Sequence, residues 1–159
     1  MVIRPLPIER LGELNQIYDM SRYENFQQIR KGNLESCKEI CFVAEEEGRF
    51  VGEVSIMTEN ANIPAAVIPN KRMYFFGLRV LPEFQRRGIG TALMTCAISQ
   101  CLKRGIFEFT IGVESDNANA KRLYERLGFK PFLENCSEVQ FGKVCRFDLL
   151  LKAVPHNIR

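Results

Sequence analysis

The stretch Q-R-R-G-I-G-T at residues 85–91 lies between an apolar run at residues 74–81 and a helical pattern that begins near residue 89. This order predicts a strand, a tight turn and the start of a helix. Glycine lets a ligand approach the backbone, and the unpaired N–H groups of a new helix favour phosphate oxygens. The stretch therefore predicts a turn that binds an anion.

The residues alone leave the ligand of this turn open. Glycines between a strand and a helix often serve only the geometry of the backbone. Here no Lys-Ser/Thr follows them as in a P-loop, and the full G-x-G-x-x-G of a dinucleotide fold is missing. Either the turn binds a different phosphate ligand, or it binds none.

A second motif, N-A-N-A-K-R-L-Y-E-R-L-G-F at residues 117–129, follows another β-rich run. Four apolar residues recur at helical spacing and predict a short helix with an inward face: Ala120, Leu123, Tyr124 and Leu127. Ser115, Asp116 or Asn117 can cap the start of this helix, and Gly128 suits its end.

Together, L-R-V-L-P-E plus Q-R-R-G-I-G-T and the downstream N-x-x-A-x-x-L-Y-x-x-x-G-F resemble the GNAT superfamily of acetyl-CoA-dependent N-acetyltransferases. The resemblance is close over residues 74–131 and general elsewhere. It implies an α/β (α+β) fold in one domain over residues 1–159. A mixed central sheet of about six to seven strands would be flanked by about four helices.

The resemblance implies acetyl-CoA as the co-substrate. Its pyrophosphate would bind at the turn, through Gln85, Arg86, Arg87, Gly88, Gly90 and Thr91. Backbone N–H groups of Leu78 and Val80 would bind the pantetheine amides and the thioester carbonyl at a strand bulge. Asn117 would either bind the pantetheine arm or only cap its helix. Tyr124 would be either a core residue or the general acid that protonates the departing thiolate.

The general base of the resembled enzymes is missing. Relatives that acetylate protein N-termini carry a glutamate where this chain has Gly112, and histone-modifying relatives carry one where it has Tyr74. Glu114 and Glu53 are alternative bases, although both are expected to be surface acids. A water chain, or the small neutral fraction of the amine near pH 8, would serve instead.

The leading hypothesis is an N-acetyltransferase that passes acetyl directly from the coenzyme to a primary amine of a small molecule or peptide. The first alternative is a coenzyme-A-binding sensor or interaction module that has lost the chemistry. The second is a nucleotide-binding regulatory domain, which the missing P-loop lysine disfavours. A homodimer is possible in each case.

Composition excludes several other classes. The formal net charge of +3 over 159 residues is too small for a nucleic-acid binder. The first residues lack the apolar core of a signal peptide, and no apolar run reaches membrane-spanning length, so we expect a cytoplasmic protein without a membrane partner. The six cysteines form no C-x-x-C pair and there is one histidine, so no metal site is expected and the thiols are expected to be reduced.

Hydrophobic periodicity predicts the remaining elements. Residues 22–41 predict either two short helices or a helix and a loop, and under the resemblance this region forms one wall of the acceptor site. Residues 58–72 predict an irregular, mobile loop beside the substrate. Helices are expected at residues 8–18, 89–104 and 117–127, and strands at residues 2–6, 42–44, 50–56, 73–81, 106–113, 129–133 and 139–151.

Overall fold

The structure, a computed structural model, describes residues 1–23, 25–59 and 62–156. The chain forms two compact units. Unit 1 consists of Met1–Met57 and Phe76–Gln100, and unit 2 consists of Thr58–Phe75 and Cys101–Arg159. The sheet has seven strands in the order β1-β2-β3-β4-β5-β7-β6, which confirms the expected mixed sheet.

Unit 1 begins with three antiparallel strands: β1 (Val2–Pro5), β2 (Glu39–Glu46) and β3 (Arg49–Met57). The turn between β2 and β3 places Glu47 at φ 51° and Gly48 at φ 78°. Two consecutive left-handed residues match the right-handed twist of the strands, so the predicted hairpin is confirmed. Most of β2 and β3 is buried, which indicates that helices cover both faces.

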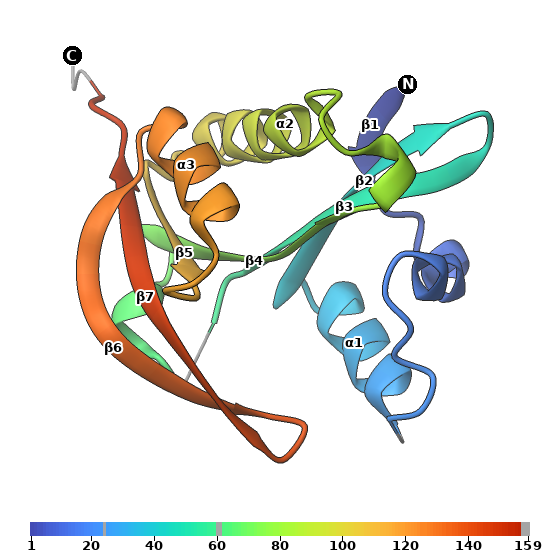
Figure 1. The fold of residues 1–159 in the computed structure, drawn as a ribbon, viewed down its shortest axis with the longest axis horizontal. Coiled ribbons are helices and arrows are strands. Elements are labelled where there is room, and N and C mark those ends of the chain that lie inside the picture. Colours follow the sequence, from blue (N-terminus) through green and yellow to red (C-terminus); the bar gives the residue numbers. More distant parts are fainter. Residues whose placement is uncertain (24, 60–61, 157–159) are drawn as a thin grey trace. The chain divides into compact units, whose positions relative to one another are not determined.

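The helices of unit 1 lie on opposite faces of β3. A Cβ atom on Gly52 would lie 3.1 Å from Leu93 of α2 (Ile89–Lys103), whereas the next residue, Glu53, contacts α1 (Phe26–Glu35). Successive side chains of a strand point to opposite faces, so α2 and α1 cover opposite sides (Figure 1). Of the two predictions for residues 22–41, the described residues agree with a helix and a loop, but β2 already begins at Glu39, inside this range, and residue 24 lies outside the described residues.

The first helix of the chain, η1 (Ile8–Gln16), is where the sequence places it but is a 3₁₀ helix. Its two buried residues, Leu11 and Leu14, are three residues apart. That spacing matches the three residues per turn of a 3₁₀ helix, so both side chains face the core of unit 1. They pack in one cluster with Val43 and Phe50.

Strand β4 (Arg72–Val80) belongs to both units. In unit 2 its first half pairs in parallel with β5 (Glu108–Val113), in a ladder that ends at Phe75↔Ile111. Strand β7 (Lys143–Ala153) is antiparallel to β5. The parallel β4–β5 pair confirms the strand–helix–strand crossover that the two motifs predict.

The C-terminal hairpin differs from the prediction. The sequence suggests short strands at 129–133 and 139–151, but β6 (Lys130–Gln140) continues to a turn at Phe141 and Gly142, with φ 51° and 77°. The sequence of residues 134–138 is mostly polar, so it lacks the apolar alternation that marks a half-buried strand, although Cys136 and Glu138 are partly buried. Its pairing with β7 also shifts register twice.

The expected loop at residues 58–72 contains one short helix, η2 (Pro64–Ala66), and residues 60 and 61 lie outside the described residues. The loop is tied to unit 2, because the hydroxyl of Thr110 donates a hydrogen bond of 2.7 Å to the carbonyl oxygen of Ala66. Its expected mobility stays a prediction.

Candidate functional site

The predicted tight turn before a helix is present in unit 1, and its binding of an anion stays a prediction. It follows a short helix, η3 (Pro82–Phe84), and the side-chain amide of Gln85 donates to the carbonyl oxygen of Val80 at 3.0 Å. Arg86 and Gly88 adopt φ 63° and 78°, and α2 begins at the next residue. Left-handed residues before a helix start direct successive N–H groups to one side, which creates a concave donor surface for an anion.

The turn faces solvent. Arg86, Arg87, Gly88 and Thr91 are exposed, whereas Ile89 is buried and anchors the start of α2. The guanidinium carbon of Arg87 lies 5.0 Å from the centre of the Phe84 ring. A Cβ atom on Gly88 would meet nothing within 4 Å, so its backbone angle, rather than space, requires glycine. The cationic side chains are therefore accessible to a ligand.

Strand β4 is distorted just before the residues expected to bind pantetheine. Gly77 has φ 65° inside the strand, the conformation that marks a bulge. Leu78 and Val80 follow it and are half-buried. A bulge leaves backbone donors without a ladder partner, so the local geometry agrees with the expectation, and the ligand itself stays a prediction.

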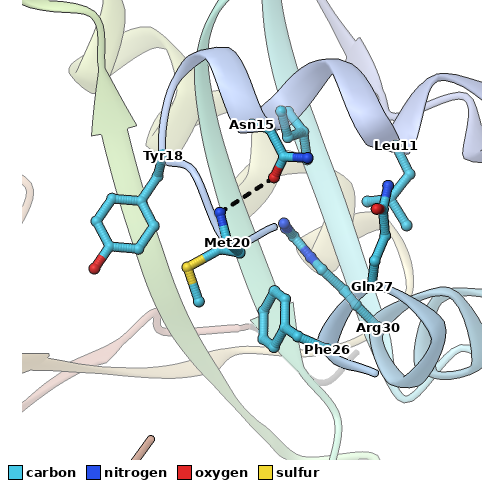
Figure 2. A pocket seen from close by; sticks show the side chains of 8 residues that line it. Leu11, Asn15, Tyr18, Met20, Phe26, Gln27 and Arg30 are labelled. Carbon is cyan, nitrogen blue, oxygen red and sulfur yellow. Dashed lines mark hydrogen bonds between the residues drawn. The ribbon is translucent and has the colours of Figure 1, made fainter. Parts of the chain in front are cut away.

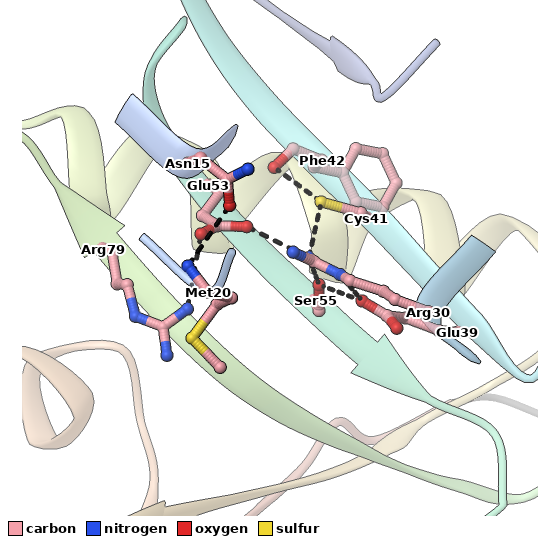
Figure 3. Close-up of polar contacts among 9 residues, drawn as sticks. All are labelled: Asn15, Met20, Arg30, Glu39, Cys41, Phe42, Glu53, Ser55 and Arg79. Atoms are coloured by element: carbon pink, nitrogen blue, oxygen red, sulfur yellow. Dashed lines mark hydrogen bonds and ion pairs between the residues drawn. The ribbon is translucent and has the colours of Figure 1, made fainter. Parts of the chain in front are cut away.

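Glu53 is not a surface acid, contrary to the prediction. Its side chain comes from the middle of β3 and is 1% exposed. Its Oε2 atom lies 3.1 Å from Nη2 of Arg30, and its Oε1 atom lies 3.3 Å from Nη1 of Arg79 (Figure 3). Both carboxylate oxygens are thus paired with guanidinium groups, which disfavours Glu53 as a general base.

The cluster around Glu53 is balanced in charge. Nε of Arg30 donates to Glu39 at 2.9 Å, and the hydroxyl of Ser55 donates to the same carboxylate at 2.8 Å (Figure 3). Two arginines therefore face two buried glutamates, and buried charges need such pairing. Burial and the charge of Glu53 raise the pKa of the neighbouring Cys41 thiol to about 12.

A pocket opens beside this cluster, between η1 and α1 (Figure 2). Its lining residues are Leu11, Leu14, Asn15, Tyr18, Met20, Phe26, Gln27 and Arg30. Tyr18 also lies under Arg79, whose guanidinium carbon is 4.1 Å from the ring centre. No motif predicts this arrangement. The available signal is a glutamate inside the apolar run of β3.

Tyr124 lies on α3 (Ala118–Arg126) in unit 2 and is 6% exposed. Its ring packs edge-on against Phe129, with 6.1 Å between the ring centres. Burial raises the pKa of the phenol to about 12. The hydroxyl is therefore a neutral hydrogen-bond donor at physiological pH.

Asn117 caps the start of α3. Its Oδ1 atom accepts a hydrogen bond of 3.1 Å from the N–H of Ala120. At the other end, Gly128 adopts φ 92°, and Nζ of Lys152 donates to the carbonyl oxygen of Leu127 at 2.6 Å. Both predicted helix ends are confirmed.

Other side chains closely surround Gly112, the position at which relatives carry a catalytic glutamate. A Cβ atom on Gly112 would lie 2.9 Å from the Phe147 ring and 3.1 Å from the Tyr74 hydroxyl. A glutamate there would require both aromatic residues to move. The two departures from the resembled pattern, Gly112 and Tyr74, therefore fit each other.

Besides burial, Glu138, a carboxylate that no sequence motif includes, raises the pKa of Tyr74. Burial raises the pKa of Tyr74 well above its ordinary value, and Glu138 of β6 and Tyr124 raise it further. Glu138, Tyr124 and Cys136 of unit 2 thus each raise the pKa of Tyr74. Glu114 is exposed, as expected.

The described residues hold no group of three or more histidine, cysteine or acidic side chains that would bind a metal ion. Within residues 1–23, 25–59 and 62–156, no helix is long and apolar enough to cross a membrane. All six cysteines are free, and two of them, Cys41 and Cys101, are buried. The cytoplasmic location and the possible homodimer stay predictions.

Two curated relatives each match about half of the chain. The [ribosomal protein bS18]-alanine N-acetyltransferase of Escherichia coli is 36% identical over 76 residues, which are 46% of this chain and 51% of the relative. N-alpha-acetyltransferase 30 of Schizosaccharomyces pombe is 33% identical over 91 residues, or 57% of each protein. The chain thus spans about half the length of the curated relatives it matches.

Solved structures share the fold. The PaiA N-acetyltransferase of Thermoplasma acidophilum in complex with coenzyme A has a TM-score of 0.72 at 18% identity, with 96% of this chain and 98% of that chain covered. The ribosomal-protein-alanine N-acetyltransferase of Brucella melitensis has a TM-score of 0.75 at 20% identity, with 97% and 100% covered. Residues 8–129 match the acetyltransferase (GNAT) family, and the chain belongs to that family.

Proposed function

We propose that this protein is an N-acetyltransferase that transfers acetyl from acetyl-CoA directly to a primary amine of a small molecule or peptide. The observation that carries the proposal is the exposed turn between β4 and α2, with left-handed Arg86 and Gly88. Family membership supports it. The names of both curated relatives, which refer to protein alanine and N-alpha amines, support a peptide α-amine as one acceptor.

The coenzyme is proposed to bind along β4 and the following turn. Its pyrophosphate would accept hydrogen bonds from the backbone, Thr91 and the two arginines, at Gln85, Arg86, Arg87, Gly88, Gly90 and Thr91. Leu78 and Val80 would donate their N–H groups to the pantetheine arm and thioester carbonyl, next to the bulge at Gly77. Asn117 would contribute its side-chain NH₂ group, since its cap uses Oδ1.

In the proposed reaction, the neutral amine attacks the thioester carbonyl carbon, the C–S bond breaks, and the amide forms as the amine nitrogen loses a proton to water. Tyr124 would stabilise the departing thiolate. Its pKa of about 12 exceeds the roughly 8.5 of a thiol, so complete proton transfer would be uphill by about 5 kcal/mol. Tyr124 would therefore act mainly as a hydrogen-bond donor, and water would supply the final proton.

The acceptor would lose its ammonium proton without help from Glu53, because both oxygens of that carboxylate are paired with arginines. Relatives that acetylate protein N-termini carry a glutamate where this chain has Gly112, and the surroundings of Gly112 leave no room for a carboxylate. We therefore propose that the small neutral fraction of the amine is the nucleophile.

The same absence of a base favours one alternative, a coenzyme-A-binding sensor without catalysis. Thermal unfolding with acetyl-CoA, coenzyme A and ATP, followed by an assay for coenzyme A released in the presence of an amine panel, separates the candidates. Stabilisation by acetyl-CoA with amine-dependent release supports the enzyme. Stabilisation by both coenzymes without release from any amine supports the sensor. Stabilisation by ATP alone would contradict both.

A further inference from the structure

The guanidinium of Arg79 is fixed in place but keeps free donors. Nη1 contacts Glu53 at 3.3 Å, and the guanidinium carbon lies 4.1 Å from the Tyr18 ring (Figure 3 shows Arg79 beside Glu53). The side chain is 38% exposed. Among the described residues, Glu53 is its one hydrogen-bond acceptor. Because a guanidinium carries five N–H donors, Nε and Nη2 remain for a ligand.

Arg79 lies next to the bulge of β4. A Cβ atom on Gly77 would lie 3.4 Å from Nη1 of Arg79 and 3.9 Å from its guanidinium carbon. The guanidinium thus covers the residue at which β4 is distorted, immediately before the proposed donor Leu78. A group bound to Arg79 would lie close to the thioester carbonyl, given the proposed function.

Arg79 is not placed to bind the coenzyme phosphates. The turn and the start of α2 lie on the face of β3 toward which Gly52 points, because Leu93 and Ile89 of α2 surround that position. Arg79 pairs with Glu53, which points to the opposite face. That face carries η1, α1 and the pocket to which Tyr18 contributes (Figure 2).

We infer that Arg79 binds a carboxylate of the acceptor, so that the preferred acceptors are amines that also carry a carboxylate. Guanidinium groups match carboxylates with two parallel hydrogen bonds, and an arginine that is already oriented loses little freedom on binding. Glu53 orients Arg79 in this assignment and is itself held by Arg30. The inference rests on the proposed function, and the carboxylate comes either from a free amino acid or from an acidic peptide.

Binding of reaction products tests the inference without depending on amine basicity. N-acetylalanine is compared with N-acetylalaninamide, and N-acetyl-Ala-Asp-amide with N-acetyl-Ala-Asn-amide, by calorimetry with and without coenzyme A. We expect the carboxylate to bind about tenfold to a hundredfold more tightly in at least one pair. Preference in the first pair identifies free amino acids, and preference in the second identifies acidic peptides.

Three variants complete the test. Arg79→Gln is expected to remove the carboxylate preference, and Arg79→Lys, which keeps the charge on Glu53 paired, is expected to retain only part of it. Arg4→Gln is the matched control, because Arg4 is also partly exposed, at 42%, and paired with a glutamate. It should keep the full preference.

The inference is overturned if wild-type protein binds both members of each pair equally, or if Arg79→Gln keeps the preference. Neither result affects the proposed function, which fails separately if acetyl-CoA does not stabilise the wild-type protein. If acetyl-CoA does not bind, the calorimetry of the product pairs without coenzyme A still tests whether Arg79 binds a carboxylate.

Discussion

The hydroxyl oxygen of Tyr74 lies 3.1 Å from the point that a Cβ atom would occupy on Gly112. The two residues are on neighbouring parallel strands, and Phe147 closes the same space from β7 at 2.9 Å. The absence of a glutamate at either position is therefore one coupled change in packing rather than two independent losses.

Gly112→Ala is expected to destabilise the protein by about 1–3 kcal/mol, because the added methyl group overpacks a site without spare volume. Tyr74→Phe in the same chain should recover part of the loss, since it removes one of the two close contacts. Urea denaturation of the single and double variants measures this coupling. Gly32→Ala is the control, because its Cβ atom would meet nothing within 4 Å. Equal stability of Gly112→Ala and wild type would contradict the packing argument.

Local motifs predict the site only in part. The turn at residues 85–91 and the helix start near residues 115–117 depend on neighbours in sequence and were predictable from spacing, whereas the structure selects Asn117 from the three candidate caps. The pairing of Glu53 with Arg30 and Arg79 joins residues 23 and 26 positions apart, which no local pattern reveals. The continuity of β6 was missed because the sequence of its middle is mostly polar and shows no apolar alternation, even though Cys136 and Glu138 are partly buried there.

Gly88→Ala and Gly105→Ala form a matched pair for the coenzyme site. Both glycines have left-handed angles, φ 78° and 81°, and neither added Cβ atom would meet a neighbour within 4 Å. Each variant should lose about 1–2 kcal/mol of stability for the same backbone reason. Only Gly88→Ala should also lose thermal stabilisation by acetyl-CoA, which in wild type reaches about 2.7 kcal/mol at a hundredfold excess over Kd.

Gly88→Glu adds a negative charge at the same point and should abolish the response to acetyl-CoA. Thermal unfolding with and without the coenzyme measures both effects. A folded Gly88→Glu variant with the full wild-type response would show that the pyrophosphate binds elsewhere.

Tyr124→Phe keeps the buried ring and removes its hydroxyl. We expect kcat to fall by about tenfold to a thousandfold, while the response to acetyl-CoA barely changes, because the hydroxyl acts on the departing thiolate. Presteady-state kinetics must first show that chemistry limits the rate. An unchanged kcat under that condition would make Tyr124 a core residue only.

The buried thiol of Cys101 predicts a loss of stability at alkaline pH. Burial raises its pKa to about 11. Below about pH 9 the thiol is protonated in both states; between pH 9 and 11 only the unfolded chain loses the proton, so the free energy of unfolding falls as pH rises. The expected slope from this thiol is about 1.4 kcal/mol per pH unit.

Denaturant unfolding between pH 7 and 11 tests this slope. Cys101→Ala should make it shallower, whatever the variant costs at neutral pH, and Cys37→Ser controls for the loss of an exposed cysteine. The burial argument fails if Cys101→Ala and wild type lose stability in parallel above pH 9.

The missing base gives the last prediction: the ascending limb of log kcat/KM against pH should follow the acceptor amine. Glu53 is paired with two arginines and position 112 has no room for a carboxylate, so deprotonation of the acceptor itself controls the reaction. A series of related amines that spans about two pKa units should shift the limb by the same amount, and the less basic amines should react faster near neutrality. A limb that stays fixed across the series would reveal an enzymic base. Glu138→Gln and Glu114→Gln would then identify it. Glu138, which raises the pKa of Tyr74, would be tested first.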